Sequence, residues 1–198
     1  MAKLVFIDTE TTGLDNSRHE IIEIAALIVL DDGTKQFWHK RIAPAHIATA
    51  DPVALEINGY TPSDWANAPE FKDIADVFGI MLDGCVVVGH NVAFDIGFIN
   101  KAFKRCGHRI PRLRGIDTIT LVHEHLTPIG CPDLSMDTVR AFLGWVRPTA
   151  HTAATDVYDC YDLYMLLARA SVWLRFKLFV GHMYRLWRDR KQSTGKNT

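Results

Sequence analysis

The order of strand-like and helix-like segments constrains the fold of this chain more than any other feature of the sequence. Residues 20–30 are nearly all apolar, which is typical of a strand that is buried on both faces. Turn residues follow at 31–33, and residues 35–42 then alternate apolar with polar side chains, as a further strand does. With the apolar residues 5–7 ahead of them, these segments predict hairpin-linked strands, and therefore an antiparallel part of a sheet.

The second half of the chain alternates short apolar strands with helical patterns. Residues 44–70 hold four of the eight prolines and predict loops and short helices. Apolar residues recur with helical spacing in the next segment, 71–82. We expect further strands at 85–88 and 116–118, a loop at 128–133, and helices at 92–106, 119–126, 134–143 and 151–170. Strands first, then strands alternating with helices, predict an α/β fold with a mixed sheet covered by helices.

Composition excludes several classes of protein. The 198 residues suit one α/β domain with a short appendage, and 48% hydrophobic with 23% charged residues is ordinary for a globular protein. Four cysteines lie far apart without a C-x-x-C pair, which argues against a zinc site and for reduced thiols. No segment has a signal-peptide core or the roughly 20 apolar residues of a membrane span. We therefore expect a cytoplasmic protein without a transmembrane segment.

Charge divides the chain into two parts. The net charge is −1, but residues 171–198 carry seven Lys or Arg against one Asp, a formal +6, so residues 1–170 carry −7. We expect a domain over 1–170 and a basic amphipathic helix and tail over 171–198. One stripe of that helix is apolar, and we expect it to pack on the body while Lys177, Arg185 and Arg188 face away. The stripe residues are Val172, Phe176, Phe179, Val180, Met183 and Trp187. Nucleic-acid, protein-docking and membrane-surface roles remain open.

Two acids follow the first apolar segment. Asp8 and Glu10 are two residues apart, so on a strand they project from the same face. Two adjacent carboxylates repel each other, and a divalent cation bound by their oxygens relieves that repulsion. A strand that simply ends in a polar turn explains the same pair, and further carboxylates from elsewhere in the chain decide between the two interpretations.

Further acids come from two later segments. Asp95 falls in the first turn of the helix that follows the strand at 85–88, where the helix dipole favours an acid in any case. Ligand sites of open α/β sheets also lie at such strand ends. His151 and Asp156 are five apart, about 140° around a continuous helix, so they share a site only if His151 precedes the helix.

Together these segments resemble the three motifs of the DEDDh branch of 3′→5′ exonucleases, the family of bacterial polymerase proofreading subunits and several stand-alone nucleases. FIDTETTGL at 6–14 is similar to the first motif, GHNVAFD at 89–95 to the second, and HTAATD at 151–156 to the third. The resemblance covers about residues 3–169, in family order. It implies an RNase H-like fold with a mixed, mainly five-stranded sheet flanked by helices.

The resemblance also implies chemistry and site residues. Asp8, Glu10, Asp95 and Asp156 are expected to bind two divalent ions, Mg²⁺ or Mn²⁺, and His151 to act as general base. The expected reaction is stepwise hydrolysis at the 3′ end of DNA, single-stranded by preference, with release of nucleoside 5′-monophosphates. Proofreading subunits dock to a polymerase through segments after the nuclease domain, so docking through 171–198 is a further expectation.

Substrate contacts and alternative functions are also implied. Expected contacts to the terminal nucleotide come from Thr9, Thr11 and Asn91, with Leu14 or Ile57 against its base. RNA is the alternative substrate, since the same site cuts both polymers. A nuclease-like docking module without activity is the alternative from another class, and retention of all five signature residues argues against it. A phosphatase of the aspartyl-phosphate type would carry Asp-x-Asp at the first strand. The sequence Asp8-Thr9-Glu10 there argues against that function.

Overall fold

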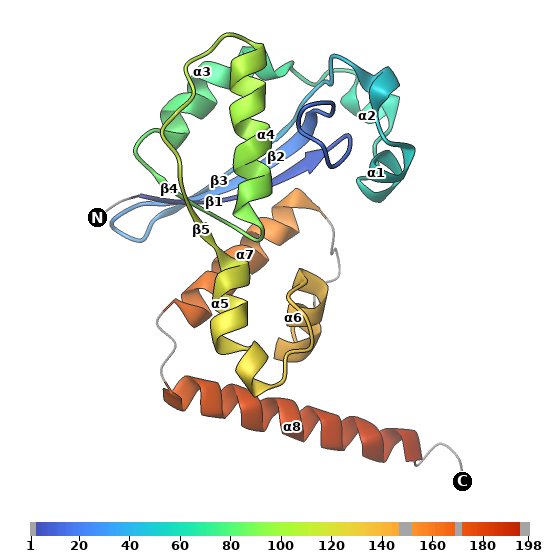
Figure 1. Cartoon of the computed structure of the whole chain (residues 1–198), viewed down its shortest axis with the longest axis vertical. Helices are drawn as coiled ribbons and strands as arrows, with labels where there is room; N and C mark the ends of the chain where they lie inside the picture. The colour runs from blue at the N-terminus through green and yellow to red at the C-terminus, as the bar shows by residue number, and fades with distance from the viewer. Residues whose placement is uncertain (1–2, 147–151, 169–171, 195–198) are drawn as a thin grey trace. The chain divides into compact units, whose positions relative to one another are not determined.

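The structure is a computed structural model that describes residues 3–146, 152–168 and 172–194 (Figure 1). It divides into two compact units. Unit 1 comprises residues 1–118 and 149–162, and unit 2 comprises 119–148 and 163–198. The expected boundary between an exonuclease domain at 1–170 and a basic C-terminal helix and tail at 171–198 stays a prediction.

The sheet of unit 1 has five strands in the order β3-β2-β1-β4-β5. β1 pairs antiparallel with β2 and β2 with β3, whereas β1–β4 and β4–β5 are parallel. The strands are β1 (Leu4–Thr11), β2 (Ile21–Val29), β3 (Lys35–Arg41), β4 (Val86–Gly89) and β5 (Arg114–Asp117). The predicted mixed sheet with an antiparallel first half is therefore confirmed.

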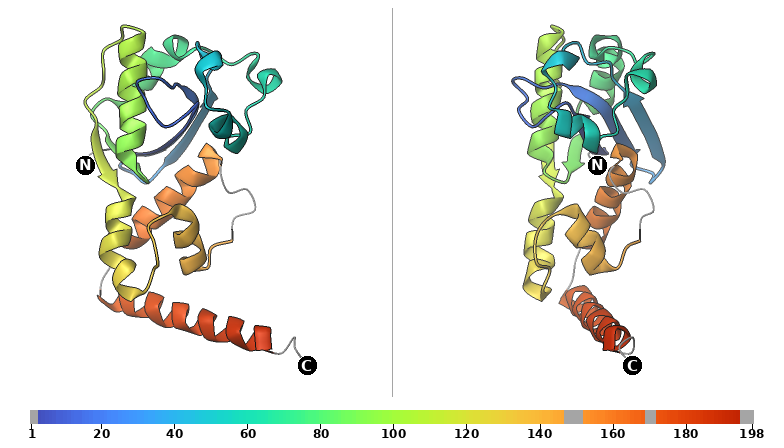
Figure 2. Two further views of the ribbon diagram at one scale, coloured as in Figure 1. Left: turned by 45° about the vertical axis from the view of Figure 1, so that its right-hand side comes forward. Right: turned by 90° about the vertical axis from the view of Figure 1, so that its right-hand side faces the viewer.

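Helices of unit 1 cover both faces of this sheet. α3 and α4 lie side by side on one face, and the first part of α7 lies on the other (Figure 2). The helices are η1 (Ile47–Thr49), α1 (Pro52–Ile57), α2 (Pro62–Trp65), α3 (Phe71–Leu82), α4 (Val92–Arg105) and α7 (Ala153–Leu167). α3 has the bounds that its apolar periodicity predicted, with a capping box between Glu70 and Asp73 at its start.

The alternation of side chains along β1 separates the core from the site. Val5 and Ile7 are buried in the cluster that contains Phe78 of α3 and Ile99 of α4. Residues between them in the sequence face the other way, where the ring of Phe6 meets Tyr161 of α7 edge to face with 5.1 Å between centroids. Asp8 and Glu10 continue that second face. The core of one face thus fixes which residues reach the other.

Unit 2 is helical and has a core of its own. Val122, Leu126, Val139 and Phe142 are buried together with Leu163 and Leu167, the end of α7. The helices of unit 2 are α5 (Thr118–His125), whose first residue still belongs to unit 1, η2 (Thr127–Ile129), α6 (Met136–Leu143) and α8 (Val172–Thr194). η2 occupies part of the segment for which a loop was predicted, and its Pro128 lies in the first turn, where proline is tolerated.

The predicted packing of α8 through its apolar stripe is wrong. Phe176, Phe179, Val180, Met183 and Trp187 are between 41% and 55% exposed.

Contacts of α8 come from a different side of the helix. Leu178 packs against the core of unit 2, and the ring of His182 lies 4.2 Å from that of Phe142. Arg185, expected to face away, donates a hydrogen bond to the carbonyl of Phe142 and covers Gly144, at the end of α6. The reason is that the last carbonyls of a helix lack partners and carry partial negative charge, so a guanidinium binds there favourably.

Within the described residues, no helix is long and apolar enough to cross a membrane.

Candidate active site

The site forms where β1 ends and α7 begins. Asp8 and Glu10 project from the same face of β1, and Asp156 lies in the first turn of α7. One carboxylate oxygen from each of the three lies within 4.8 Å of the others. Pairing between β1 and β2 shifts register between Glu10 and Thr11, at the end of the strand that carries both acids.

Burial and mutual repulsion make these acids hard to ionise without a cation. The pKa of Asp8 is raised well above its ordinary value, first by burial and then by the charges of Asp95 and Glu10. Burial and the charges of Asp156 and Glu23 raise the pKa of Glu10 to about 7. A divalent cation with hard oxygen ligands removes both penalties at once, so the three convergent carboxylates fit such an ion.

Asp95 reaches the same region from α4. It is 4% exposed, and its Oδ1 accepts hydrogen bonds from the backbone N–H of Thr9 at 3.0 Å and from the Thr9 hydroxyl at 2.7 Å. Burial raises the pKa of Asp95 to about 7 although these two bonds oppose the shift. Asp95 is close enough to raise the pKa of Asp8 but is not one of the three ligands that converge within 4.8 Å.

The junction between β4 and α4 orients Asp95. Gly89 ends β4, and a Cβ there would lie only 3.1 Å from the backbone of Val92, so this close approach favours glycine. Asn91 has φ +73°, and its N–H donates to Oδ1 of Asp117 at 3.0 Å. The buried Thr118 hydroxyl donates to the carbonyl of Gly89 at 3.1 Å. The end of β5 and the first residue of α5 therefore hold the start of α4, and with it Asp95.

Glu23 is a further acid of the site that the sequence patterns did not identify. It lies directly opposite Glu10 in the β1–β2 ladder. Its side chain is only 12% exposed and accepts a 2.8 Å contact from Nε2 of His39 on β3. The available signal was a single charged residue inside an otherwise apolar strand, but its position opposite Glu10 depends on the register, which the sequence does not specify.

The other predicted residues are placed as follows. Thr9 and Thr11 are both 6% exposed; Thr9 holds Asp95, and the Thr11 hydroxyl donates to the carbonyl of Gly13 at 2.8 Å. Leu14 is 84% and Ile57 65% exposed. His151 lies outside the described residues. All nucleotide contacts stay predictions, and the structure assigns structural roles to the two threonines.

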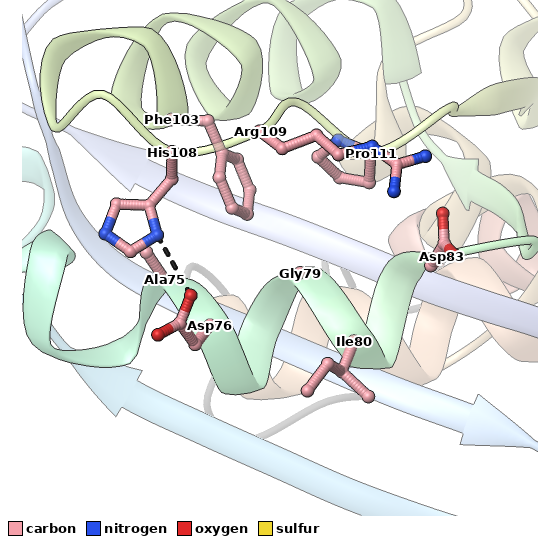
Figure 3. A pocket seen from close by; sticks show the side chains of 9 residues that line it. All are labelled: Ala75, Asp76, Gly79, Ile80, Asp83, Phe103, His108, Arg109 and Pro111. Atoms are coloured by element: carbon pink, nitrogen blue, oxygen red, sulfur yellow. Dashed lines mark hydrogen bonds and ion pairs between the residues drawn. The ribbon is translucent and has the colours of Figure 1, made fainter.

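Two cavities of unit 1 lie away from the acids. One of about 340 Å³ lies beside α3 and the segment after α4, where Nδ1 of His108 contacts Asp76 at 3.0 Å (Figure 3). The other, about 410 Å³, is lined mainly by apolar side chains with Glu20, His46 and Arg105. Among the described lining residues of both cavities, none belongs to the acidic cluster. The acidic cluster is thus distinct from these two cavities, and its three acids are half-buried.

Comparison with known proteins identifies the family. The family model for exonucleases of the RNase T type matches residues 5–164. The chain belongs to the DEDDh exonuclease family. DNA polymerase III subunit epsilon of Buchnera aphidicola subsp. Acyrthosiphon pisum (strain APS) is 31% identical over 174 residues, 83% of this chain and 72% of the relative. Ribonuclease T of Shewanella sp. (strain W3-18-1) is 30% identical over 178 residues, 81% of this chain and 78% of the relative.

Solved structures of exonuclease I confirm the fold. The Escherichia coli enzyme in complex with a dT13 oligonucleotide superposes with a TM-score of 0.74 at 19% identity, over 85% of this chain and 41% of that chain. The chain thus spans less than half the length of exonuclease I, and at this identity the likeness concerns the RNase H-like fold alone. With the family established, the predictions of an RNase H-like α/β fold and of a 3′→5′ exonuclease are confirmed.

Proposed function

We propose that this exonuclease degrades single-stranded DNA from its 3′ end and releases nucleoside 5′-monophosphates, using two Mg²⁺ or Mn²⁺ ions. The observation that carries the proposal is the convergence of Asp8, Glu10 and Asp156 within 4.8 Å, beside Asp95. Burial and neighbouring charges raise the pKa values of Asp8, Glu10 and Asp95. An anionic phosphodiester is repelled by such a cluster unless cations are bound, so the same geometry that favours metal also makes substrate binding depend on it.

Each acid has a role in this proposal. Asp8, Glu10 and Asp156 would hold one ion, and Asp8 with Asp95 the second. When bound, the two ions supply an acidified water and neutralise the charge that develops on the phosphate and the leaving oxygen. Thr9 fixes Oδ1 of Asp95 with two hydrogen bonds and so sets the direction in which that carboxylate points. Glu23 adds negative charge beside Glu10 and strengthens its need for a cation.

Comparing the rates at which DNA and RNA strands are shortened tests the proposed substrate. Matched single strands of DNA and RNA, and the corresponding DNA duplex, are incubated with the enzyme and Mg²⁺ under single-turnover conditions. We expect the single DNA strand to be shortened fastest. A faster rate on the RNA strand would replace the proposal by its alternative, an exoribonuclease.

His151 is proposed as the general base. An imidazole with a reference pKa of about 6.5 accepts a proton from the attacking water at neutral pH. We expect His151→Ala to lower kcat by about 10²–10⁴-fold and to abolish the rise of the wild-type rate through the pKa of the imidazole. Rate–pH profiles of both proteins at saturating Mg²⁺ measure this, and a near-normal rate in His151→Ala would remove His151 from the mechanism.

Residues 171–198 are proposed to add an electrostatic contact to nucleic acid, with docking to a polymerase or another protein as the alternative. Lys177, Arg188 and Lys191 are exposed on α8, which supports the first role. The exposed aromatic rings of Trp173, Phe176 and Trp187 support the second.

Neutralising these charges distinguishes the two roles. We expect the triple variant Lys177→Gln/Arg188→Gln/Lys191→Gln to weaken binding of single-stranded DNA and to reduce the slope of log K against log salt by about 2, since each phosphate contact contributes about 0.7. Binding titrations at several salt concentrations measure the slope. The variant Lys72→Gln on α3 is the control, and an unchanged slope in the triple variant would leave only docking for this segment.

The proposed location is the cytoplasm, where thiols stay reduced. The cysteines at 85, 106, 131 and 160 are all described and all free, which is consistent with that compartment.

A further inference from the structure

The edge strand β3 presents a row of basic and aromatic side chains on the same face of the sheet as the catalytic acids. In the ladders, Asp8 is opposite Ala25 and Ala25 opposite His39, while Glu10 is opposite Glu23 and Glu23 opposite Arg41. Residues directly opposite each other project to the same side of a sheet. His39 and Arg41 therefore lie level with the two acids, about 10 Å away across two strand spacings.

Aromatic rings extend this row away from the acids. Phe37 is 44% exposed, and its ring stacks on that of Tyr158 from α7, with 5.6 Å between centroids and 27° between planes. Tyr158 is 43% exposed. The ring of His39 lies nearly parallel to Phe37, at 9° and 6.2 Å. Three rings in similar orientation thus form one exposed surface.

This surface is continuous with the acidic cluster and is positively charged at both ends. His39 contacts Glu23, which faces Glu10. Lys35 begins β3 with its ammonium 4.1 Å from the ring centre of Tyr161, and Arg41 ends it with its guanidinium 4.4 Å from that of Trp65. Core packing does not explain an apolar ring on this exposed edge, because Trp38 supplies that contact on the opposite face, stacked on Phe78.

We propose that Lys35, Phe37, His39, Arg41 and Tyr158, here called the β3 track, bind the single strand upstream of the nucleotide being removed. Bases stack on the rings of Phe37 and Tyr158, and phosphates lie near Lys35 and Arg41. Aromatic rings beside cations are the usual means of binding a single strand without reading its sequence. A duplex does not offer unpaired base faces to these rings, so the track favours single-stranded substrates. The inference rests on the proposed function.

The test compares a long and a minimal substrate. The variant Phe37→Leu/Tyr158→Leu keeps apolar side chains but removes the stacking planes, and Phe37→Trp keeps a plane. Because one stacked base contributes about 1–3 kcal/mol, we expect the double variant to raise KM for a single-stranded 15-mer of DNA by about 5- to 150-fold. Phe37→Trp should retain the wild-type KM. Hydrolysis of the p-nitrophenyl ester of thymidine 5′-monophosphate, which has no upstream nucleotide, should be unchanged in every variant.

The controls separate this inference from the proposed function. Val77→Ala removes exposed apolar surface from α3, on the other face of the sheet. It should change neither the KM for the 15-mer nor the hydrolysis of the ester. A wild-type enzyme that cleaves neither the ester nor the 15-mer contradicts the proposed function itself. Cleavage of both with an unchanged KM in the double variant overturns the β3 track alone. Sedimentation of all variants is compared as well. If the rise in KM accompanies a change from dimer to monomer, the surface is a contact between copies of the chain, and the track is overturned.

Discussion

Asp8→Asn is expected to abolish hydrolysis and, in the absence of metal, to make the protein more stable. The amide cannot provide the negative charge that a divalent ion needs, and losing several kcal/mol of transition-state stabilisation lowers the rate by at least about a thousandfold. The same substitution removes a carboxylate whose pKa is raised by burial and by the charges of Asp95 and Glu10. The neutral amide avoids that repulsion at neutral pH, so unfolding becomes harder.

Both halves of this prediction are measured on one preparation. Thermal unfolding at pH 7.5 with chelator should give a Tm several degrees above that of the wild type, since 1 kcal/mol corresponds to about 2–4 °C in a chain of this size. Asp76→Asn is the matched control, because Asp76 is an exposed acid on α3 that contacts His108 and belongs to no part of the cluster. An Asp8→Asn protein that is less stable than the wild type without metal would show that the carboxylate is not under repulsion.

Stability of the metal-free protein is expected to fall as the pH rises from about 4.5 to above 7. The pKa values of Glu10 and Asp95 are raised from 4.5 and 3.8 to about 7 in the folded protein. The folded state therefore holds protons that the unfolded state has already released in this range, and its advantage is lost as these two acids ionise. For Glu10 alone the loss is on the order of 3 kcal/mol, or roughly 6–12 °C in Tm.

Divalent metal should reverse this loss. Mn²⁺ or Mg²⁺ binds the ionised acids, so it should raise the Tm strongly at pH 8 and little at pH 5, where protons compete for the same oxygens. Melting curves over this pH range, with chelator and with each metal, measure both effects. The double variant Glu10→Gln/Asp95→Asn should show a flatter pH dependence and no metal effect. An equal slope in wild type and variant would assign the pH dependence to other groups.

The sequence predicted the sheet and most helices because their signals are local. The apolar run of β2, the alternation in β3 and the helical spacing of α3 each follow from which faces are buried. The order of the three motifs likewise identified Asp8, Glu10, Asp95 and Asp156 before their proximity was known. The bounds were predicted less accurately, since the helix expected at 151–170 begins at Ala153 and ends at Leu167.

Features that depend on register or on a partner surface could not be predicted. The bonds from Thr9 to Asp95 join residues 86 apart, and Glu23 reaches the site only through its pairing with Glu10. The apolar stripe on α8 predicted a packed face, but periodicity contains no information on whether a complementary surface exists, and the described residues of the stripe are exposed. Instead, Arg185 of α8 binds the end of α6, where unpaired backbone carbonyls attract a cation.

The most direct test of a metal-dependent 3′→5′ exonuclease built on Asp8 is the fate of a single DNA strand labelled at its 5′ end. With Mg²⁺ or Mn²⁺, the wild-type protein should produce a ladder of labelled fragments that shorten one nucleotide at a time, together with nucleoside 5′-monophosphates. Chelator, or the Asp8→Asn substitution, should leave the strand intact. Immediate release of a labelled mononucleotide, or an unchanged ladder in Asp8→Asn, would contradict this account.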